Sequence, residues 1–78
     1  MPVKITKHAR ERMEKYELKE EQVTNCLKKP DLIIKGNEGR KIAQKRLNGY
    51  VLRVIYEETG NNFVVITTYK AKRERYEI

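Results

Sequence analysis

Residues 40–56 read RKIAQKRLNGYVLRVIY, two alternating segments joined at Asn48-Gly49. This dipeptide is the strongest short-range hairpin signal in the chain, because a two-residue type I′ turn needs a positive φ at both central residues. A turn of this length also sets which residues lie opposite one another in the two strands. The predicted pairs are Leu47 with Tyr50, Arg46 with Val51, Gln44 with Arg53, and Ile42 with Ile55.

Paired residues point to the same side of a sheet, so this hairpin has two chemically different faces. The apolar face, which we expect to form the core, carries Ala43, Leu47, Leu52, Val54 and Tyr56. The other face carries Arg40, Ile42, Gln44, Arg46, Val51, Arg53 and Ile55. Three arginines on one face indicate either the ordinary polar outer surface of an antiparallel sheet or a surface that binds anions.

Before Pro30 the apolar pattern is helical. Thr6 is a suitable N-cap for a helix over about residues 7–16, with Ile5, Ala9, Met13 and Tyr16 on one apolar stripe. A second helix is predicted over about residues 20–28, with Val23, Cys26 and Leu27 facing inward. His8 and Arg12 are four residues apart on the flank of the first stripe, so their side chains are neighbours.

After Pro30 the pattern has a period of two. Strands are expected at 32–34, 40–47, 50–58 and 62–70, followed by a basic tail (71–78) that is either a short helix or extended. The chain is therefore predicted to be a single α+β domain over residues 1–78. Its two N-terminal helices pack on one face of a four-stranded antiparallel sheet, in the order ααββββ.

The last turn determines which way the fourth strand faces. A three-residue loop, Thr59-Gly60-Asn61 with Gly60 left-handed, pairs Glu58 with Asn62. It places Phe63, Val65, Thr67 and Tyr69 on the arginine face, with Thr67 opposite Arg53, and it places Val64, Ile66 and Thr68 on the helix-covered face. A four-residue loop would reverse these faces.

The composition limits the classes of function. The chain has 78 residues and 18 Lys and Arg against 11 Asp and Glu, which leaves a net charge of +7. This excess favours polyanionic partners such as RNA, DNA or an acidic protein, and the short length argues against a dinucleotide-binding fold. No apolar segment is long enough to cross a membrane, and no secretory leader is recognisable. A single cysteine, Cys26, forms no internal disulfide, so we expect a cytoplasmic protein.

The polar residues of the arginine face suggest RNA chemistry. Arginine binds phosphate with two hydrogen bonds, and aromatic rings stack on bases. The candidate nucleic-acid-binding residues are Arg40, Gln44, Arg46, Lys70 and Arg73. His8 is the natural candidate for a general acid or base, but it lies on a helix packed on the opposite face and would have to reach around the sheet edge. One His, one Cys and one Asp form no ligand cluster, so neither metal nor cofactor is expected.

The stretch Thr6–Met13 resembles the opening H-A-x-x-R-M of the family called domain of unknown function 4258. The segments Glu20–Val23, Lys29–Asp31, Leu52–Val54 and Val65–Tyr69 are similar to later parts of that family. The family in turn resembles the RelE/colicin-type ribonuclease superfamily, many of whose members are toxins. This resemblance implies a RelE-like fold and metal-free RNA cleavage, with His8, Arg53, Thr67 and Tyr69 as the matching catalytic positions.

Three functional hypotheses follow. The first is a metal-independent endoribonuclease, the toxin of a toxin–antitoxin pair, with RNA and an antitoxin protein as partners. The second is a non-catalytic RNA-binding or ribosome-binding module that uses the same face. The third is a protein-interaction domain. No membrane partner is expected, and the sequence leaves a homodimer open.

Overall fold

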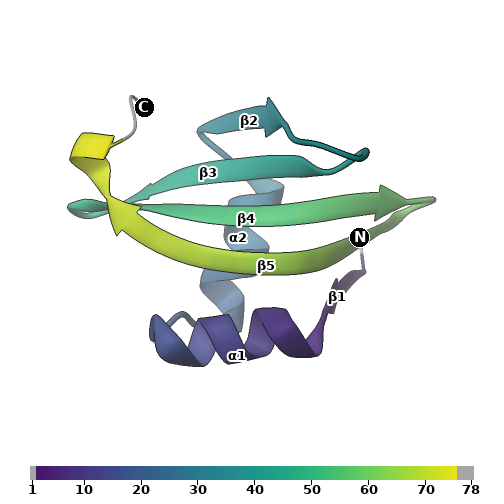
Figure 1. Cartoon of the computed structure of the whole chain (residues 1–78), viewed down its shortest axis with the longest axis horizontal. Helices are drawn as coiled ribbons and strands as arrows, with labels where there is room; N and C mark the ends of the chain where they lie inside the picture. Colours follow the sequence, from purple (N-terminus) through teal and green to yellow (C-terminus); the bar gives the residue numbers. More distant parts are fainter. Residues whose placement is uncertain (1, 76–78) are drawn as a thin grey trace.

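The computed structural model describes residues 2–75, which form a sheet with two helices against it (Figure 1). The elements are β1 (Val3–Ile5), α1 (Lys7–Lys15), α2 (Glu20–Lys28), β2 (Leu32–Lys35), β3 (Lys41–Leu47), β4 (Tyr50–Thr59), β5 (Asn62–Lys72) and the 3₁₀ turn η1 (Arg73–Arg75). The α+β class and both helices are confirmed. The last three residues of the predicted tail, 76–78, lie outside the described residues.

The sheet has five strands in the order β1-β5-β4-β3-β2, so the predicted four-stranded antiparallel sheet is wrong in two respects. β1 is an additional strand, and it pairs parallel to β5, with Val3 opposite Phe63 and Ile5 opposite Val65. Three residues are too few to show a strand period, and their pairing partner lies about sixty residues away in the chain. Strands β2 to β5 are antiparallel, as predicted.

The hairpin between β3 and β4 has the predicted register, from Leu47 opposite Tyr50 to Ile42 opposite Ile55. The turn differs from the expected type I′, because Asn48 has a φ of 58° whereas Gly49 lies outside the left-handed region. The two-residue loop length is therefore what sets the pairing.

The core lies on the predicted face of the hairpin. Four of its predicted residues are almost fully buried against both helices: Ala43, Leu52, Val54 and Tyr56. Ala9 and Met13 enter the core from α1, and Val23, Cys26 and Leu27 enter it from α2. The opposite face is less open than expected, because Gln44 is 1% exposed and Val51 is fully buried.

The pairing of β4 with β5 differs from the prediction in two places: the turn is shorter, and a bulge interrupts the middle of β5. Thr59 pairs with Asn62, so the loop has two residues, and Gly60 has a φ of 60°. Val65 lies opposite Tyr56 and Thr67 opposite Ile55, which leaves Ile66 as an extra residue in a β-bulge.

The shorter turn reverses the faces of the residues before the bulge. Phe63 and Val65 belong to the core rather than to the arginine face, and Val64 lies on the arginine face. The bulge then shifts the alternation again. Thr67 and Tyr69 consequently lie on the arginine face and Thr68 on the helix-covered face, as predicted, but Arg53 is opposite Tyr69 rather than Thr67.

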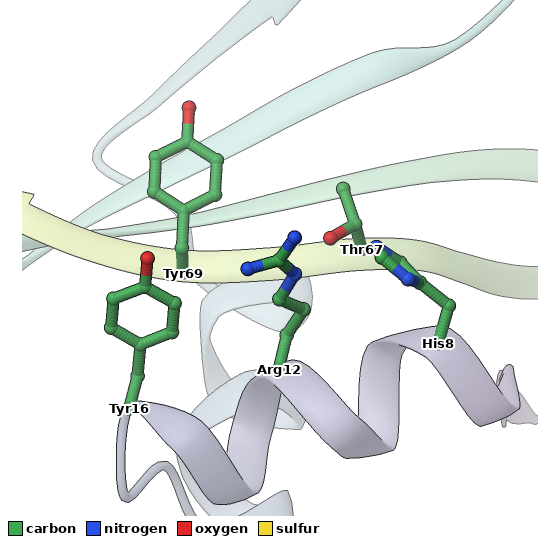
Figure 2. A pocket seen from close by; sticks show the side chains of 5 residues that line it. All are labelled: His8, Arg12, Tyr16, Thr67 and Tyr69. Atoms are coloured by element: carbon green, nitrogen blue, oxygen red, sulfur yellow. The ribbon is translucent and has the colours of Figure 1, made fainter.

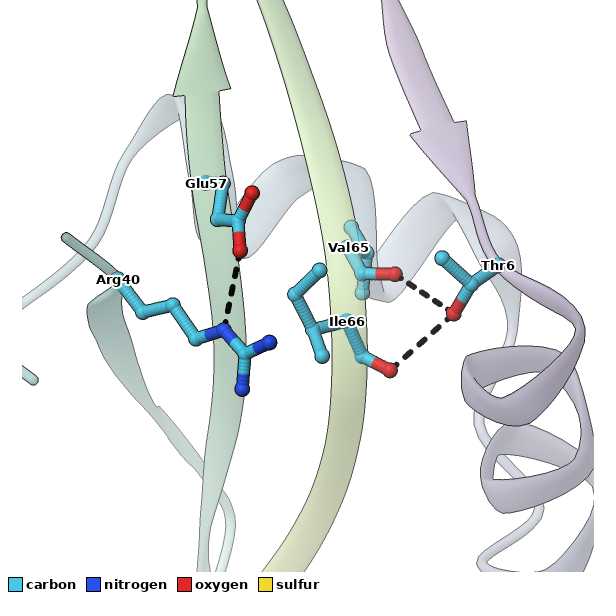
Figure 3. A network of polar contacts seen from close by, with 5 residues as sticks. All are labelled: Thr6, Arg40, Glu57, Val65 and Ile66. Atoms are coloured by element: carbon cyan, nitrogen blue, oxygen red, sulfur yellow. Dashed lines mark hydrogen bonds and ion pairs between the residues drawn. The ribbon is translucent and has the colours of Figure 1, made fainter. Parts of the chain in front are cut away.

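Thr6 connects the start of α1 to the bulge of β5 (Figure 3). Its hydroxyl oxygen lies 2.9 Å from the carbonyl oxygen of Val65 and 3.1 Å from that of Ile66, and it accepts a hydrogen bond from the Ala9 amide at 3.2 Å. Thr6 is thus the predicted N-cap of α1, and it also attaches the first turn of the helix to the carbonyl group of the bulge residue. This attachment fixes α1 alongside the second half of β5.

Candidate functional site

An open pocket lies between α1 and β5 (Figure 2). His8 and Arg12 line it from α1, Tyr16 from the C-cap position directly after this helix, and Thr67 and Tyr69 from β5. The three helix residues are spaced four apart and therefore lie on one face of α1. Figure 2 shows the Arg12 side chain reaching between Tyr69 and Thr67, with His8 beside Thr67 and Tyr16 beside Tyr69. The pocket thus combines an imidazole, a guanidinium, a small hydroxyl and two phenols.

The position of α1 explains how a helix residue reaches the arginine face. β1 ends at Ile5, opposite Val65, so it pairs with only the first part of β5. Beyond that point α1 lies along the edge of β5 (Figure 1). One side of the helix contributes Ala9 and Met13 to the core. The neighbouring side places His8 in the pocket that Thr67 and Tyr69 line from the arginine face of the sheet. His8 therefore reaches the residues of the arginine face, although the sequence placed its helix on the opposite face of the sheet.

Arg53 joins this group from the neighbouring strand β4. Its Nη1 donates a hydrogen bond of 2.5 Å to the Tyr69 hydroxyl oxygen, and Arg53 and Tyr69 are direct cross-strand partners. The ring of Tyr69 in turn packs against Tyr16, with centroids 6.5 Å apart and planes tilted by 49°. A continuous row of contacts therefore runs from Arg53 through Tyr69 to Tyr16, and it links the sheet to the end of α1.

The four predicted catalytic residues lie close together, whereas the five predicted nucleic-acid-binding residues are dispersed. Arg40 forms an ion pair with Glu57 at 3.0 Å (Figure 3), and Gln44 is buried opposite Arg53. Arg46 is exposed and lies opposite Val51, near the far end of the hairpin. A pocket that binds RNA would therefore use a smaller set of cations than the sequence suggested.

Lys70 and Arg73 are also away from the pocket. Lys70 pairs with Leu52 and so points to the other face of the sheet, where its Nζ lies 5.1 Å from the centroid of the Tyr50 ring. Arg73 belongs to η1, and its backbone amide donates to the carbonyl of Gly49 at 3.0 Å. Both residues lie near the hairpin turn rather than beside α1.

Two residues of the pocket, Arg12 and Tyr16, were not among the predicted site residues. The sequence identified Arg12 only as a neighbour of His8, and it placed Tyr16 on the apolar stripe of the first helix. Their spacing from His8 by four and eight positions was a usable signal, because such residues line one face of a helix. What the sequence did not reveal is that this face borders β5.

Other reactive groups lie outside the pocket. Burial raises the pKa of the Cys26 thiol to about 12, so this thiol is protonated at neutral pH and does not act as a nucleophile. Within residues 2–75, no three His, Cys, Asp or Glu side chains gather in an arrangement that could hold a metal ion. No helix among these residues is long and apolar enough to span a membrane.

The fold and the pocket define a small basic α+β protein with a cationic, tyrosine-lined pocket at a sheet edge. A model of the family described as "Domain of unknown function (DUF4258)" matches residues 5–70, and the chain belongs to this family. The resemblance seen in the H-A-x-x-R-M segment is thereby confirmed at the level of the family. No curated protein and no solved structure matches the chain.

Proposed function

We propose that this protein is a RelE-like, metal-independent endoribonuclease that acts as the toxin of a toxin–antitoxin pair. The observation that carries the proposal is the gathering of His8, Arg12, Thr67 and Tyr69 in one open pocket. An imidazole beside a guanidinium and a phenol is a set of groups sufficient for general acid–base cleavage of RNA. The order of two helices followed by antiparallel strands also supports the relationship that the resemblance implies.

The reaction is a transesterification within the RNA. The ribose 2′-oxygen attacks the adjacent phosphorus, the bond from phosphorus to the 5′-oxygen breaks, and the products are a 2′,3′-cyclic phosphate and a 5′-hydroxyl. His8 accepts the proton of the 2′-hydroxyl. The Tyr69 hydroxyl, which accepts a hydrogen bond from Arg53, keeps its own hydrogen to donate to the leaving 5′-oxygen.

The two arginines supply positive charge where the phosphorane forms. Arg12 reaches into the pocket from α1 (Figure 2). Arg53 lies on β4 and donates a hydrogen bond to the Tyr69 hydroxyl oxygen. Guanidinium groups aimed at developing negative charge are an effective form of transition-state stabilisation. The Tyr16 ring offers a surface on which a neighbouring base can stack.

A cleavage assay in the presence of EDTA tests this proposal. We expect the purified protein to cut single-stranded RNA without divalent metal and to leave 2′,3′-cyclic phosphate ends. The Arg53→Ala variant should lose this activity. Cleavage that disappears with EDTA, or that is unchanged in Arg53→Ala, would contradict the assignment of this pocket.

The biological role has a separate test. Expression of the wild-type protein in a bacterial host should arrest growth, and expression of Arg53→Ala should not. Unimpaired growth with abundant wild-type protein would argue against the toxin role while leaving the chemistry to be judged by the cleavage assay.

The same pocket also favours a second candidate, an RNA-binding module without catalysis. Arginine and stacked tyrosines bind RNA whether or not a proton-transfer pair is in place. RNA binding that weakens steeply with salt, together with intact RNA after long incubation, would support the module rather than the enzyme.

A further inference from the structure

The edge strand β2 exposes an unusual amount of apolar surface. It is the last strand of the sheet, and among residues 2–75 it pairs with β3 alone. Its three consecutive apolar residues, Leu32, Ile33 and Ile34, are 41%, 50% and 38% exposed. Proteins usually protect an edge strand with charges, prolines or a covering element, because unpaired backbone groups on an apolar edge attract another strand. This edge is therefore suited to strand addition.

The hydrogen-bonding pattern of β2 determines which backbone groups face outward. The Gly36 amide donates to the Arg40 carbonyl at 2.8 Å, which makes Gly36 and Arg40 a hydrogen-bonded pair with β3. In an antiparallel ladder such pairs recur at every second residue, so Ile34 also bonds to β3. The amide and carbonyl groups of Ile33 and Lys35 consequently point away from the sheet.

The charges at the two ends of β2 make the strand complementary to itself. Asp31 precedes the strand and Lys35 ends it, so the segment reads Asp-Leu-Ile-Ile-Lys with Ile33 at its centre. In an antiparallel pair centred on Ile33, each Lys35 lies opposite Asp31 of the other strand. The Asp31 carboxylate is held in place by the Arg46 backbone amide, which donates to its Oδ2 at 2.8 Å. That hydrogen bond also keeps the pKa of the carboxyl below its usual value, with smaller contributions from Lys45, Arg46 and Arg73.

We propose that β2 pairs with β2 of a second copy of this chain, antiparallel and centred on Ile33. The outward-pointing groups of Ile33 would bond to the same groups of its counterpart across the two-fold axis, which is the pattern of an isologous interface. Two five-stranded sheets would then join into one sheet of ten strands.

The side chains fit this arrangement. Ile33 lies on the same face as its partner Ala43, the helix-covered face, so the two copies of Ile33 would meet there. Leu32 and Ile34 pair with Gln44 and Ile42, so they lie on the opposite face. There, Leu32 of each copy would contact Ile34 of the other copy. All three exposed apolar side chains thereby become covered. The interface is one short strand on each side, so we expect a dimer that dissociates on dilution.

This inference does not rest on the proposed function. β2 forms one edge of the sheet, whereas β5 and α1 lie on the other side of the sheet (Figure 1). The pocket is lined from α1 and β5 and is therefore remote from β2. A dimer through β2 would leave both pockets open. Loss of the dimer should therefore leave RNA cleavage unchanged, and loss of cleavage should leave the dimer unchanged.

Sedimentation over an about hundredfold range of protein concentration tests the dimer, and two charge variants test its register. Lys35→Asp places two acidic residues opposite each other at both ends of the pairing, and Asp31→Lys places two basic residues there. Each variant alone should shift the dissociation constant upward by about tenfold or more. An equimolar mixture of the two should recover the dimer, because every opposed pair is then of opposite charge.

Controls separate this effect from net charge and from misfolding. Lys72→Asp makes the same change in net charge at the exposed end of β5 and should leave the dimer intact. Lys35→Asp changes an exposed side chain, so its circular dichroism and thermal unfolding should match those of the wild type. Ile33→Lys, which places two ammonium groups at the two-fold axis, should abolish the dimer.

Several results would overturn the proposal. One is a wild-type protein that is monomeric at every concentration. Another is a protein that does not self-associate and instead pairs β2 with a strand of a different protein. Another is a dimer that tolerates Lys35→Asp or Ile33→Lys. A mixture of the two charge variants that stays monomeric would likewise contradict the register.

Discussion

Arg53 and Tyr69 are direct cross-strand partners, and Arg53 donates a hydrogen bond to the Tyr69 hydroxyl oxygen. This bond gives a charged side chain in the middle of β4 a defined partner on β5. It also orients the Tyr69 ring, which packs against Tyr16 at the end of α1. Tyr69, which lines the pocket, thus connects the sheet to the C-terminal end of α1.

Removing only the hydroxyl of this tyrosine tests the link between Arg53 and the reaction. In Tyr69→Phe the ring still packs on Tyr16, but the acceptor for Arg53 and the proposed proton donor are lost. We expect cleavage to fall by about tenfold to a hundredfold, and the free energy of unfolding to fall by about 1 kcal/mol. Tyr50→Phe, a matched change at an exposed tyrosine on the same sheet, should alter neither. Normal cleavage by Tyr69→Phe would remove Tyr69 from the mechanism.

Two arginines on α1 provide a matched pair for testing phosphate binding. Arg12 lines the pocket, whereas Arg10 lies 3.8 Å from Glu20 on the exposed side of the helix. We expect Arg12→Ala to weaken RNA binding and to reduce the slope of log affinity against log salt by about one. Arg10→Ala makes the same change in net charge and should preserve this slope. Equal effects from both variants would indicate a general charge effect rather than a site.

Thr6 should be important for stability and for the shape of the pocket. Its hydroxyl caps α1 and contacts the carbonyl groups at the bulge. We expect Thr6→Ala to lower the free energy of unfolding by about 1–2 kcal/mol, measured by urea denaturation. RNA cleavage should fall as well, because His8 and Arg12 lose their alignment with β5. Thr24→Ala in α2 is the control and should change the free energy of unfolding little. An equal decrease in both variants would show that the contacts of the Thr6 hydroxyl do not stabilise the fold specifically.

The buried thiol should make the protein sensitive to alkaline pH. Burial raises the pKa of Cys26 from 9.0 to about 12, so above pH 9 the unfolded chain releases a proton that the folded chain retains. The contribution of this thiol to the free energy of unfolding is therefore fully present below pH 9. Above pH 9 the free energy of unfolding falls by about 1.4 kcal/mol per pH unit. The measurement is best confined to pH 8–10, because burial also raises the pKa of Tyr56 from 10.0.

The variant Cys26→Ala isolates this contribution. It should show a flatter dependence of unfolding free energy on pH over that range. In the wild type, thiol reagents should label Cys26 only under conditions that unfold the protein. Rapid labelling of the native protein at neutral pH would contradict the burial argument.

The parts of the fold that could be predicted from the sequence depend on local signals. The Asn48-Gly49 turn and the alternation around it were sufficient for the pairing of Gln44 with Arg53. The helix over residues 20–28 was bounded by acidic residues at its start and Pro30 after its end, and its limits are confirmed. In each case the deciding residues are neighbours in the chain.

The parts that could not be predicted depend on distant contacts. The pairing of β1 with β5 and the bulge at Ile66 have no local signature, and both are stabilised through contacts with Thr6 and the residues before it. Two errors in β5 compensated for each other. The turn was one residue shorter than predicted and the bulge added one residue, so Thr67 and Tyr69 lie on the predicted face although their partners were wrong.

The candidate site was predictable only in part for the same reason. His8, Thr67 and Tyr69 were identified as polar positions matching the family, but the proximity of α1 to the second half of β5 is a tertiary feature. Arg12 and Tyr16 belong to the pocket because of that proximity. A helical face of three functional side chains could be recognised in the sequence, but the surface that it borders could not.

The part that His8 plays in RNA cleavage within this pocket is tested by comparing the wild type with His8→Ala. RNA binding and RNA cleavage are measured together in EDTA for the wild type and for His8→Ala. We predict that His8→Ala binds RNA with nearly wild-type affinity and cleaves it about a hundredfold more slowly or less. Cleavage by His8→Ala at the wild-type rate would show that His8 is not catalytic, and a wild-type protein that binds RNA and never cuts it would not be a ribonuclease.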